Sequence, residues 1–284
     1  QPPIMHEHAG GSTIEVDHRT SGAGRVPAAP PTGAIRLSAG DLHDDEVRRA
    51  ERVYTAAYLR LEAAVPGFSV EDVEGLTHIR YGRPKAGLSH ELYAGETPPD
   101  VVLDVVSRHP ELADAFIAPY TRQEATEPAW TDAGYTRIVR NYLMRLDVST
   151  AGGRPDDQLV RLSELPEVER LAALREDGRI IPGYLDDPAL GCYALMVDDV
   201  PVASAVVIAD GDMAVVEYVH TLERYRRLGY GRWLMRGLQR LAANAGARWV
   251  VLSSNERGRP LYYALGYQLL SYEDIYRRQD LPSH

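Results

Sequence analysis

The residues best suited to chemistry lie in one loop near the C-terminal end, where two glycines follow a run of arginines. The loop reads Arg226-Arg227-Leu228-Gly229-Tyr230-Gly231. It follows a β-branched apolar stretch that ends near Val219 and precedes an amphipathic stretch that stops at Gly246. A strand, a glycine-rich turn and a helix in this order leave backbone N–H groups free beside the positive end of a helix. The loop therefore predicts a site for an anion, of which phosphate is the usual example.

Two common phosphate-binding patterns are excluded by the spacing of this loop. The dinucleotide-binding fingerprint needs a third glycine and an early strand–helix–strand unit, and a P-loop needs Gly-Lys followed by Ser or Thr. The order Arg-x-x-Gly-x-Gly is by itself also compatible with a solvated helix cap. Taken alone, the loop predicts an anion and no particular ligand.

The charge and composition of the chain narrow the choice of partner. The 284 residues carry a formal net charge of −10, so nucleic acid is not expected as the main partner. A basic loop in an acidic chain favours a small polyanionic ligand. The single cysteine, Cys192, is typical of a protein from the reducing cytoplasm. No apolar run reaches membrane-spanning length and no secretory signal pattern is present, so no membrane partner is expected.

The distribution of glycine and proline predicts two α/β domains. Residues 1–33 are rich in both and lack an apolar period, which predicts an extended or disordered arm. The spacing of its His6, Glu7, His8, Asp17 and His18 does not place them on a common face, so we expect no metal site. Residues 151–157 read AGGRPDD and predict a linker between domains at 34–150 and 158–284.

Hydrophobic periodicity predicts a mixed α/β order in both halves. For the first half we expect strands at 34–38, 76–81, 88–94 and 135–146, with helices at 41–65, 101–107 and 111–118. For the second half we expect strands at 158–162, 192–197, 201–209, 213–220, 249–253 and 267–272, with helices at 164–174, 231–245 and 260–265. The basic loop then connects a strand to the helix at 231–245.

Two motifs together resemble the GNAT superfamily of N-acetyltransferases. Residues 219–231, VHTLERYRRLGYG, are similar to that family's acetyl-CoA loop, and residues 260–267, PLYYALGY, are similar to its closing signature. The resemblance covers residues 157–275, with Arg227 where the family usually has Gly. It implies a mixed central β-sheet flanked by helices and splayed at the fourth strand. The first half would be a degenerate copy of the same unit, giving two units in tandem.

The resemblance also implies how acetyl-CoA would be held as the acyl donor. The backbone of Tyr218, Val219 and Thr221 would pair with the pantetheine amides like an added strand. Asn255 would contact the pantetheine arm. The pyrophosphate would lie against backbone N–H groups of the loop and against nearby guanidinium groups. The residues implied for the pyrophosphate are Arg226, Arg227, Leu228, Gly229, Tyr230, Gly231 and Arg232.

Three side chains are candidates for the chemistry itself. The resemblance places Tyr262 on the family's tyrosine, which would protonate the departing thiolate. An attacking amine must also lose a proton, and a carboxylate acting through water can accept it. Glu217 lies in an apolar strand, where an acid is costly unless it is paired or functional. His220 is the alternative base because histidine titrates near neutral pH, and pairing of Glu217 with an arginine across the sheet is the structural alternative.

The resemblance implies a cytoplasmic acetyl-CoA-dependent N-acetyltransferase that transfers acetyl directly to the amine of a small molecule, as a monomer or homodimer. Acids near the cleft, such as Glu217, Asp186 and Asp187, favour a cationic acceptor. We expect the loop at 180–188 and the first half of the chain to form the acceptor site. A transferase with another acyl-CoA or acceptor in secondary metabolism, and a non-catalytic acyl-CoA-binding protein, remain alternatives.

Overall fold

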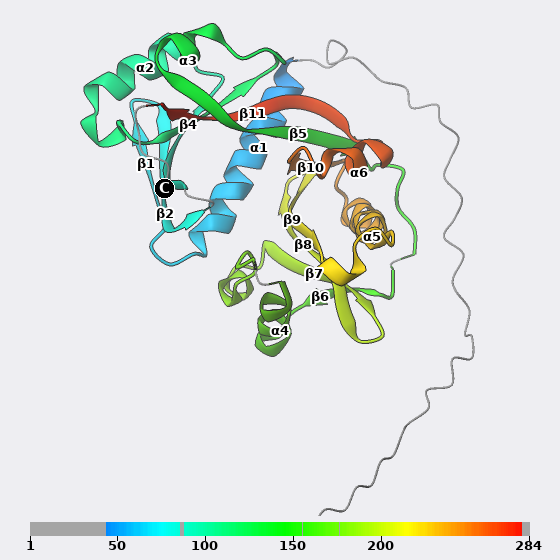
Figure 1. Cartoon of the computed structure of the whole chain (residues 1–284). Coiled ribbons are helices and arrows are strands. Elements are labelled where there is room, and N and C mark those ends of the chain that lie inside the picture. The colour runs from blue at the N-terminus through cyan, green and yellow to red at the C-terminus, as the bar shows by residue number, and fades with distance from the viewer. Residues whose placement is uncertain (1–43, 86–87, 155, 176, 280–284) are drawn as a thin grey trace, which may run out of the picture. The chain divides into compact units, whose positions relative to one another are not determined.

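The described part of the chain builds one eleven-stranded mixed sheet with helices on both faces (Figure 1). The computed structural model describes residues 44–85, 88–154, 156–175 and 177–279. The predicted arm at 1–33, with its histidines, and the strand predicted at 34–38 lie outside these residues. The strands are β1 Ser69–Val73, β2 Leu76–Lys85, β3 Leu88–Gly95, β4 Phe116–Thr121, β5 Tyr135–Asp147, β6 Leu159–Leu162, β7 Leu190–Val197, β8 Val200–Asp210, β9 Met213–Thr221, β10 Trp249–Ser254 and β11 Gln268–Arg278.

The two halves of the chain exchange their last strands within this sheet. The order is β1-β2-β3-β4-β11-β5-β10-β9-β8-β7-β6. Strand β5 ends the first half but pairs with β10 and β11, and β11 ends the second half but pairs with β4 and β5. Figure 1 shows β5 (green) and β11 (red) running together between the two groups of strands. Strand β5 therefore covers the edge at β10 in the second half, and β11 covers the edge at β4 in the first half.

The helices cover both faces of the sheet. They are α1 Asp44–Ala63, α2 Pro99–Arg108, α3 Pro128–Asp132, α4 Leu165–Arg175, α5 Tyr230–Asn244 and α6 Arg259–Ala264, with short 3₁₀ turns η2 Pro110–Leu112, η3 Pro182–Asp186 and η4 Glu223–Tyr225. Helix α5 packs Leu234 and Leu238 against Val216 of β9 and Val250 of β10. None of the helices in the described ranges is both long and apolar enough to cross a membrane.

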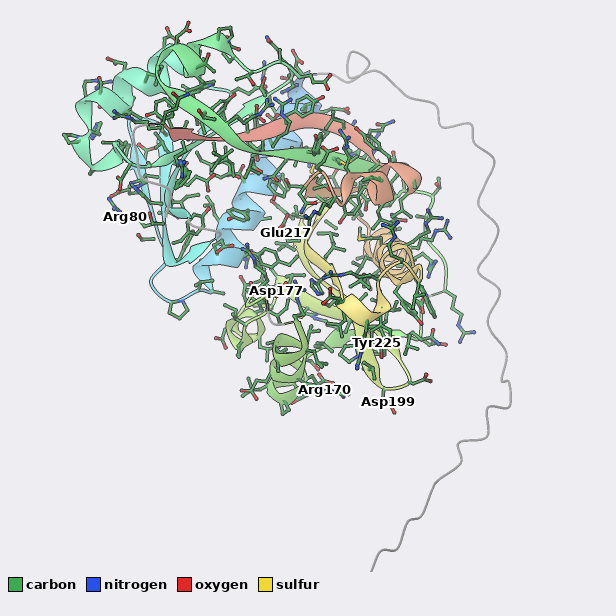
Figure 2. The ribbon with its side chains drawn as sticks, in the orientation of Figure 1. Arg80, Arg170, Asp177, Asp199, Glu217 and Tyr225 are labelled. Atoms are coloured by element: carbon green, nitrogen blue, oxygen red, sulfur yellow. The ribbon has the colours of Figure 1, made fainter. Side chains whose placement is uncertain are left out.

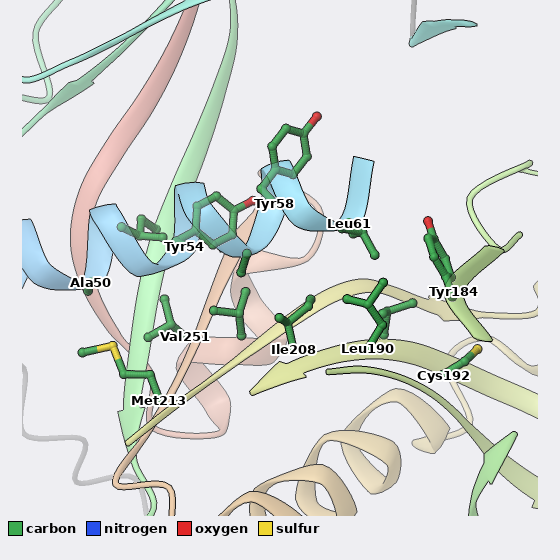
Figure 3. Close-up of a cluster of buried hydrophobic side chains, with 14 of the residues drawn as sticks. Ala50, Tyr54, Tyr58, Leu61, Tyr184, Leu190, Cys192, Ile208, Met213 and Val251 are labelled. Atoms are coloured by element: carbon green, nitrogen blue, oxygen red, sulfur yellow. The ribbon is translucent and has the colours of Figure 1, made fainter. Parts of the chain in front are cut away.

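Helix α1 belongs to the first half of the chain but packs largely on the strands of the second half. Three acidic residues lie in the first turn of the helix, where their negative charges interact favourably with the positive end of the helix dipole. Its buried positions recur every three or four residues, as an amphipathic helix requires. Figure 3 shows Tyr54 and Leu61 of α1 above Ile208 and Val251 of the sheet. One core thus joins the two halves, and α1 is held against the site-bearing strands.

The predicted fold class, a mixed α/β sheet flanked by helices, is confirmed, but the helix predicted at 111–118 is wrong. The turn η2 and then strand β4 occupy this stretch. Strand β4 lies between β3 and β11, with Ile117 and Ala118 fully buried. An internal strand covered on both faces lacks the alternating pattern that identifies a strand from sequence. Strand β1 and helix α3 are additional elements that the periodicity did not predict.

Candidate active site

Strands β9 and β10 separate part-way along their length, and this opening defines the candidate site. They pair in parallel only from Met213 to Val215 on β9, opposite Trp249 to Val251 on β10. Beyond that point β9 continues to Thr221, and β10 to Ser254. The exposed backbone of a strand can pair with an extended ligand as with an added strand. The predicted splay at the fourth strand of the second half is thus observed at β9.

A β-bulge in β9 changes which side chains reach this opening. Ser204 of β8 pairs with His220, whereas Val206 pairs with Glu217, so β9 carries one extra residue. Within this stretch Tyr218 has a φ of 54°, in the left-handed region. A bulge bends the strand and re-aims its side chains. Four consecutive residues, 216–219, line the same cavity, which the side chains of a regularly alternating strand would not do.

A buried arginine from α4 supports the bulge. Arg175 donates through Nη1 to the Tyr218 carbonyl at 2.8 Å and to Ser204 Oγ at 3.0 Å. Its Nη2 donates to Asp177 Oδ2 at 2.6 Å. At the end of the strand, Arg226 Nε donates to the Thr221 carbonyl at 3.1 Å.

The glycine-rich loop ends in a helix start with free donors. Gly229 has a φ of 89° and precedes α5, and no side chain caps the helix. The first hydrogen bond of the helix runs from the Trp233 N–H to the Gly229 carbonyl at 3.0 Å. The N–H groups of residues 230–232 precede this bond, so they have no partner within the helix. They are arranged to bind an anion.

Glycine at position 231 brings this helix start close to the end of β9. A Cβ atom on Gly231 would lie 3.3 Å from Thr221 Oγ1 and 3.5 Å from Leu261 Cδ2. The loop surface is open, since Leu228 is 60% exposed and Arg226 and Arg227 are also exposed. The predicted pyrophosphate-binding residues are thus brought together around the N-terminus of α5, where Arg232 is half-buried.

A cavity of about 340 Å³ lies beside the opening and unites the predicted acid and base. Tyr262 of α6 lines it and is 6% exposed, and Glu217 of β9 lines it as well. Burial raises the pKa of Tyr262 well above its ordinary value, and the nearby charge of Glu217 raises it further. Figure 2 shows Glu217 near α1, at the part of β9 that faces the first half of the chain.

Asn255 and His220 occupy different surroundings. Asn255 lines the cavity, and its Oδ1 accepts from the Gly258 N–H at 2.9 Å, which fixes the turn before α6. His220 is not among the residues that line the cavity. Its Nδ1 lies 3.5 Å from Asp177 Oδ2, and burial, together with the charge of Arg175, lowers the pKa of His220. The structure therefore joins Glu217, and not His220, with Tyr262.

Residues 158–267 match the family model described as "Acetyltransferase (GNAT) family". The second half of the chain carries a GNAT-family domain. This finding agrees with the resemblance seen in the loop at 219–231 and in the signature at 260–267. Acyl transfer is accordingly the general activity of the family to which this domain belongs.

Solved structures resemble the chain over most of its length. A GCN5-related N-acetyltransferase from Kribbella flavida is 18% identical, with a TM-score of 0.59, and the match covers 82% of this chain and 96% of that chain. One from Sphaerobacter thermophilus is 13% identical, with a TM-score of 0.53, and the match covers 74% and 78%. A tandem GNAT protein from the clavulanic acid biosynthesis pathway is 13% identical, with a TM-score of 0.50, and the match covers 88% and 98%. These likenesses concern the fold. A comparison with curated proteins finds no match.

The cavity of the GNAT domain is completed by the first half of the chain, and most of these residues were missed from sequence. Glu91 and four tyrosines of the first half line it, together with Glu273 from β11 of the second half; the tyrosines are Tyr54, Tyr58, Tyr81 and Tyr93. Hydrogen bonds connect them: Tyr81 donates to Glu91 at 2.6 Å, and the Tyr58 and Tyr81 hydroxyls lie 3.0 Å apart. The composition held a signal, because 17 tyrosines against 2 phenylalanines favour hydroxyl groups inside the fold.

Two acids predicted near the cleft of the GNAT domain are not among the residues lining this cavity. Asp187 pairs with Arg60 of α1, with 2.7 Å between Asp187 Oδ1 and Arg60 Nη2. Asp186 is exposed. Ile180 and Tyr184 of the predicted acceptor loop are buried in the core, so the loop contributes to the cavity only through the adjacent Arg179. Within the described ranges, no group of three or more His, Cys, Asp or Glu side chains is arranged to hold a metal ion.

Proposed function

We propose that the chain is an N-acetyltransferase that moves the acetyl group of acetyl-CoA directly to the amine of a small molecule in the cytoplasm. The observation that carries the proposal is the shared cavity of Glu217 and Tyr262 beside the opening between β9 and β10. A proton acceptor and a hydrogen-bond donor thus flank the point where an extended ligand would end. The family of the C-terminal domain supports the same reaction class.

The residues around the opening fit an acyl-CoA. The N–H groups at the start of α5 and the exposed Arg226 and Arg227 suit a pyrophosphate. The edge of β9 that no longer pairs with β10 after Val215 suits the amides of a pantetheine arm. Asn255 borders the cavity at which such an arm would end. When bound, acetyl-CoA supplies an activated thioester, whose C–S bond breaks as the new C–N bond forms.

In this proposal Glu217 prepares the amine for attack. The carboxylate accepts a proton from the ammonium form, directly or through one water, and leaves a lone pair on nitrogen. Glu217 is buried and adjacent to Tyr54, whose pKa is raised by burial and by the charge of Glu217. A neutral tyrosine beside the carboxylate can orient it without competing for the proton.

Tyr262 acts on the departing sulfur. Its raised pKa keeps the hydroxyl protonated at neutral pH. A thiol has a pKa of about 8.5, below that of a buried tyrosine, so full proton transfer from Tyr262 would be unfavourable. We therefore assign Tyr262 the donation of a hydrogen bond that stabilises the thiolate as it leaves. The second proton that nitrogen loses as the amide forms neutralises the thiolate, so the tyrosine stays protonated throughout.

The first half of the chain is proposed to shape the acceptor side and not to bind a donor. Its parallel pair, β3 and β4, stays joined from Glu91 to Gly95, opposite Phe116 to Pro119. The helix that follows β3 begins with Pro98-Pro99 in place of a glycine-rich loop. We extend the proposal to a degenerate copy of the GNAT unit at 34–150, joined through the linker at 151–157 to the catalytic unit at 158–284.

A thiol-release assay with acetyl-CoA and a panel of small amines tests the proposal. We expect free CoA to appear only when an accepted amine is present. Calorimetric binding of CoA, measured on the same preparation, reports an intact donor site. Binding of CoA without thiol release for any amine would contradict acyl transfer and favour an acyl-CoA-binding protein.

A further inference from the structure

Two adjacent buried carboxylates on β11 differ in their partners: one is paired with a cation, and the other is hydrogen-bonded only to neutral groups. Asp274 is fully buried and pairs with Arg140, with 2.6 Å between Asp274 Oδ1 and Arg140 Nε. Glu273 is 5% exposed, and because successive side chains alternate along a strand, it faces the other side of the sheet. There it lines the cavity shared with Glu217 and Tyr262. The exchange of β11 into the first half therefore delivers an acid to the far side of this cavity.

The partners of Glu273 are neutral groups. The Tyr93 hydroxyl donates to Oε1, and the Asn141 amide donates to Oε2 at 2.9 Å. No cation among the described residues forms an ion pair with Glu273, in contrast to its neighbour Asp274. Burying a carboxylate is costly unless an opposite charge accompanies it. A cationic group on a ligand in the cavity would supply that charge.

Aromatic rings beside Glu273 favour the same kind of ligand. Ring centroids lie 6.4 Å apart for Tyr54 and Tyr58, and also 6.4 Å apart for Tyr58 and Tyr93. All three rings line the cavity. Burial raises the pKa of Tyr93 far above its ordinary value, and the charge of Glu273 adds to this effect. The tyrosines thus stay neutral, and the faces of neutral aromatic rings attract cations.

Tyr54 connects this acid to the proposed base. Its pKa is raised first by burial and then by the charges of both Glu217 and Glu273. Glu217 lies on β9 and Glu273 on β11, with β10 and β5 between them. Both side chains nevertheless line the same cavity. Two carboxylates that enter one cavity from separate strands fit the two ends of a short linear molecule.

We propose that the acceptor is a short molecule with two cationic groups, of which one is acylated beside Glu217 and the other binds to Glu273 and the tyrosines. The inference rests on the proposed function, because the first amine is the one that Glu217 deprotonates. Arg179 also lines the cavity, with its guanidinium 5.3 Å from the Tyr218 ring centroid. This arginine therefore lies at the end of the cavity near Glu217. The end near Glu273 is lined by tyrosines.

Binding of three matched probes to the CoA-bound chain tests this inference without requiring turnover. The probes are diaminobutane, butylamine and aminobutanol, which differ only in the group at the far end. Calorimetry should find diaminobutane bound at least tenfold more tightly than the other two, because only its second ammonium pairs with a buried carboxylate. Equal binding of the three probes would overturn the inference, and this comparison needs no variant.

A variant then locates the second cation. Glu273→Gln should weaken diaminobutane binding on the order of tenfold to a hundredfold and leave butylamine binding unchanged. Asp186→Asn removes the same charge from an exposed position that does not line the cavity, and should change neither value. Retained CoA affinity reports that each variant is folded. If Glu273→Gln binds diaminobutane as the native chain does, the assignment of Glu273 is wrong.

Different results would contradict the transferase activity and the dicationic acceptor. Tight binding of diaminobutane that depends on Glu273, without any thiol release, would contradict the transferase and leave the dicationic ligand in place. Thiol release that proceeds equally with butylamine and diaminobutane, at the same KM, would support the transferase and overturn the dicationic acceptor.

Discussion

Arg175 donates a hydrogen bond to the backbone carbonyl of Tyr218 across 2.8 Å, at the residue where β9 takes up its left-handed conformation. The arginine comes from α4 and the bulge from β9, so the shape of the site strand depends on a helix that does not touch the cavity. A left-handed conformation is costly for a residue other than glycine, and persists where surrounding contacts hold it. The bulge is therefore a property of the fold around it, and it sets where Glu217 points.

Replacement of Arg175 by methionine should destabilise the protein and weaken the donor site. The change leaves the Tyr218 carbonyl without its buried donor, a loss of roughly 1–3 kcal/mol in the free energy of unfolding, and removes a partner of the exposed Asp177. Denaturant unfolding and CoA calorimetry measure the two effects. Arg170→Met is the matched control on the same helix, because Arg170 is exposed and donates only to the Asp199 carbonyl, at 2.9 Å. Equal stability of the two variants would show that the arginine does not hold the bulge.

Replacement of Tyr262 by phenylalanine should lower kcat on the order of a hundredfold while CoA affinity stays within about twofold. The ring, which fills the cavity wall, is retained, and only the hydroxyl that stabilises the thiolate is lost. Tyr263→Phe provides the control, since Tyr263 is 44% exposed on the same helix and does not line the cavity. A large loss of CoA affinity in Tyr262→Phe would instead assign the hydroxyl to binding.

Substitution of the two candidate bases should separate their roles. Glu217→Gln keeps the size of the side chain but removes its capacity to accept a proton, so kcat should fall by on the order of a hundredfold or more. His220→Asn should change kcat by less than about threefold, because His220 is directed to Asp177 and not to the cavity. Steady-state kinetics with an accepted amine measure both. The opposite ranking would identify His220 as the base.

The strand, loop and helix that we propose to bind the donor could be predicted as structural elements from the sequence because their signals are local. The strand before the loop, the two glycines and the amphipathic helix follow one another within residues 213–244. Each of these elements carries its own periodicity or turn signal. Tyr262 and Asn255 were placed by a second local motif, and both line the cavity.

The cavity wall that we propose as the acceptor side could not be predicted because it is assembled from distant segments. Tyr54 lies on α1, Tyr93 on β3 and Glu273 on β11. Their proximity follows from the exchange of β5 and β11, and strand order and register are not written in local hydrophobic patterns. In the sequence, Tyr54 and Tyr58 fall at the apolar positions of an amphipathic helix, where a tyrosine resembles any other core residue. The bulge at Tyr218 was likewise missed, because the arginine that supports it lies more than forty residues away along the chain.

Replacement of Gly229 by alanine should weaken CoA binding, whereas the same replacement at Gly211 should not. Gly229 has a φ of 89°, so alanine would cost about 1 kcal/mol and distort the helix start that carries the free N–H groups. Gly211, in the turn between β8 and β9, has a φ of 57° and likewise nothing within 4 Å of an added Cβ atom. Gly211→Ala therefore reproduces the backbone strain away from the loop. Calorimetry should find reduced CoA affinity in Gly229→Ala alone, and equal affinities would remove the loop from the donor site.

The stability of the chain should fall on acidification below about pH 6.5, with His78 as one cause. His78 is fully buried, with Nδ1 2.7 Å from Glu71 Oε1 and Nε2 3.0 Å from His90 Nδ1. Burial is the largest effect and lowers the pKa of His78 below the ordinary value of 6.5. The unfolded chain then binds this proton more readily than the folded chain, so stability decreases as the pH falls through that value.

A comparison with His109 checks the sign of this effect. Hydrogen bonds to Glu74 and Glu111 raise the pKa of His109, so its contribution is present at low pH and is lost as the pH rises. His78→Asn should therefore flatten the acid-side fall of the urea midpoint between pH 7 and 5, and His109→Asn should steepen it. Measurement of the midpoint at several pH values tests both variants together. A steeper fall in His78→Asn would mean that protonation of His78 stabilises the fold, contrary to the cost expected from its burial between β2 and β3.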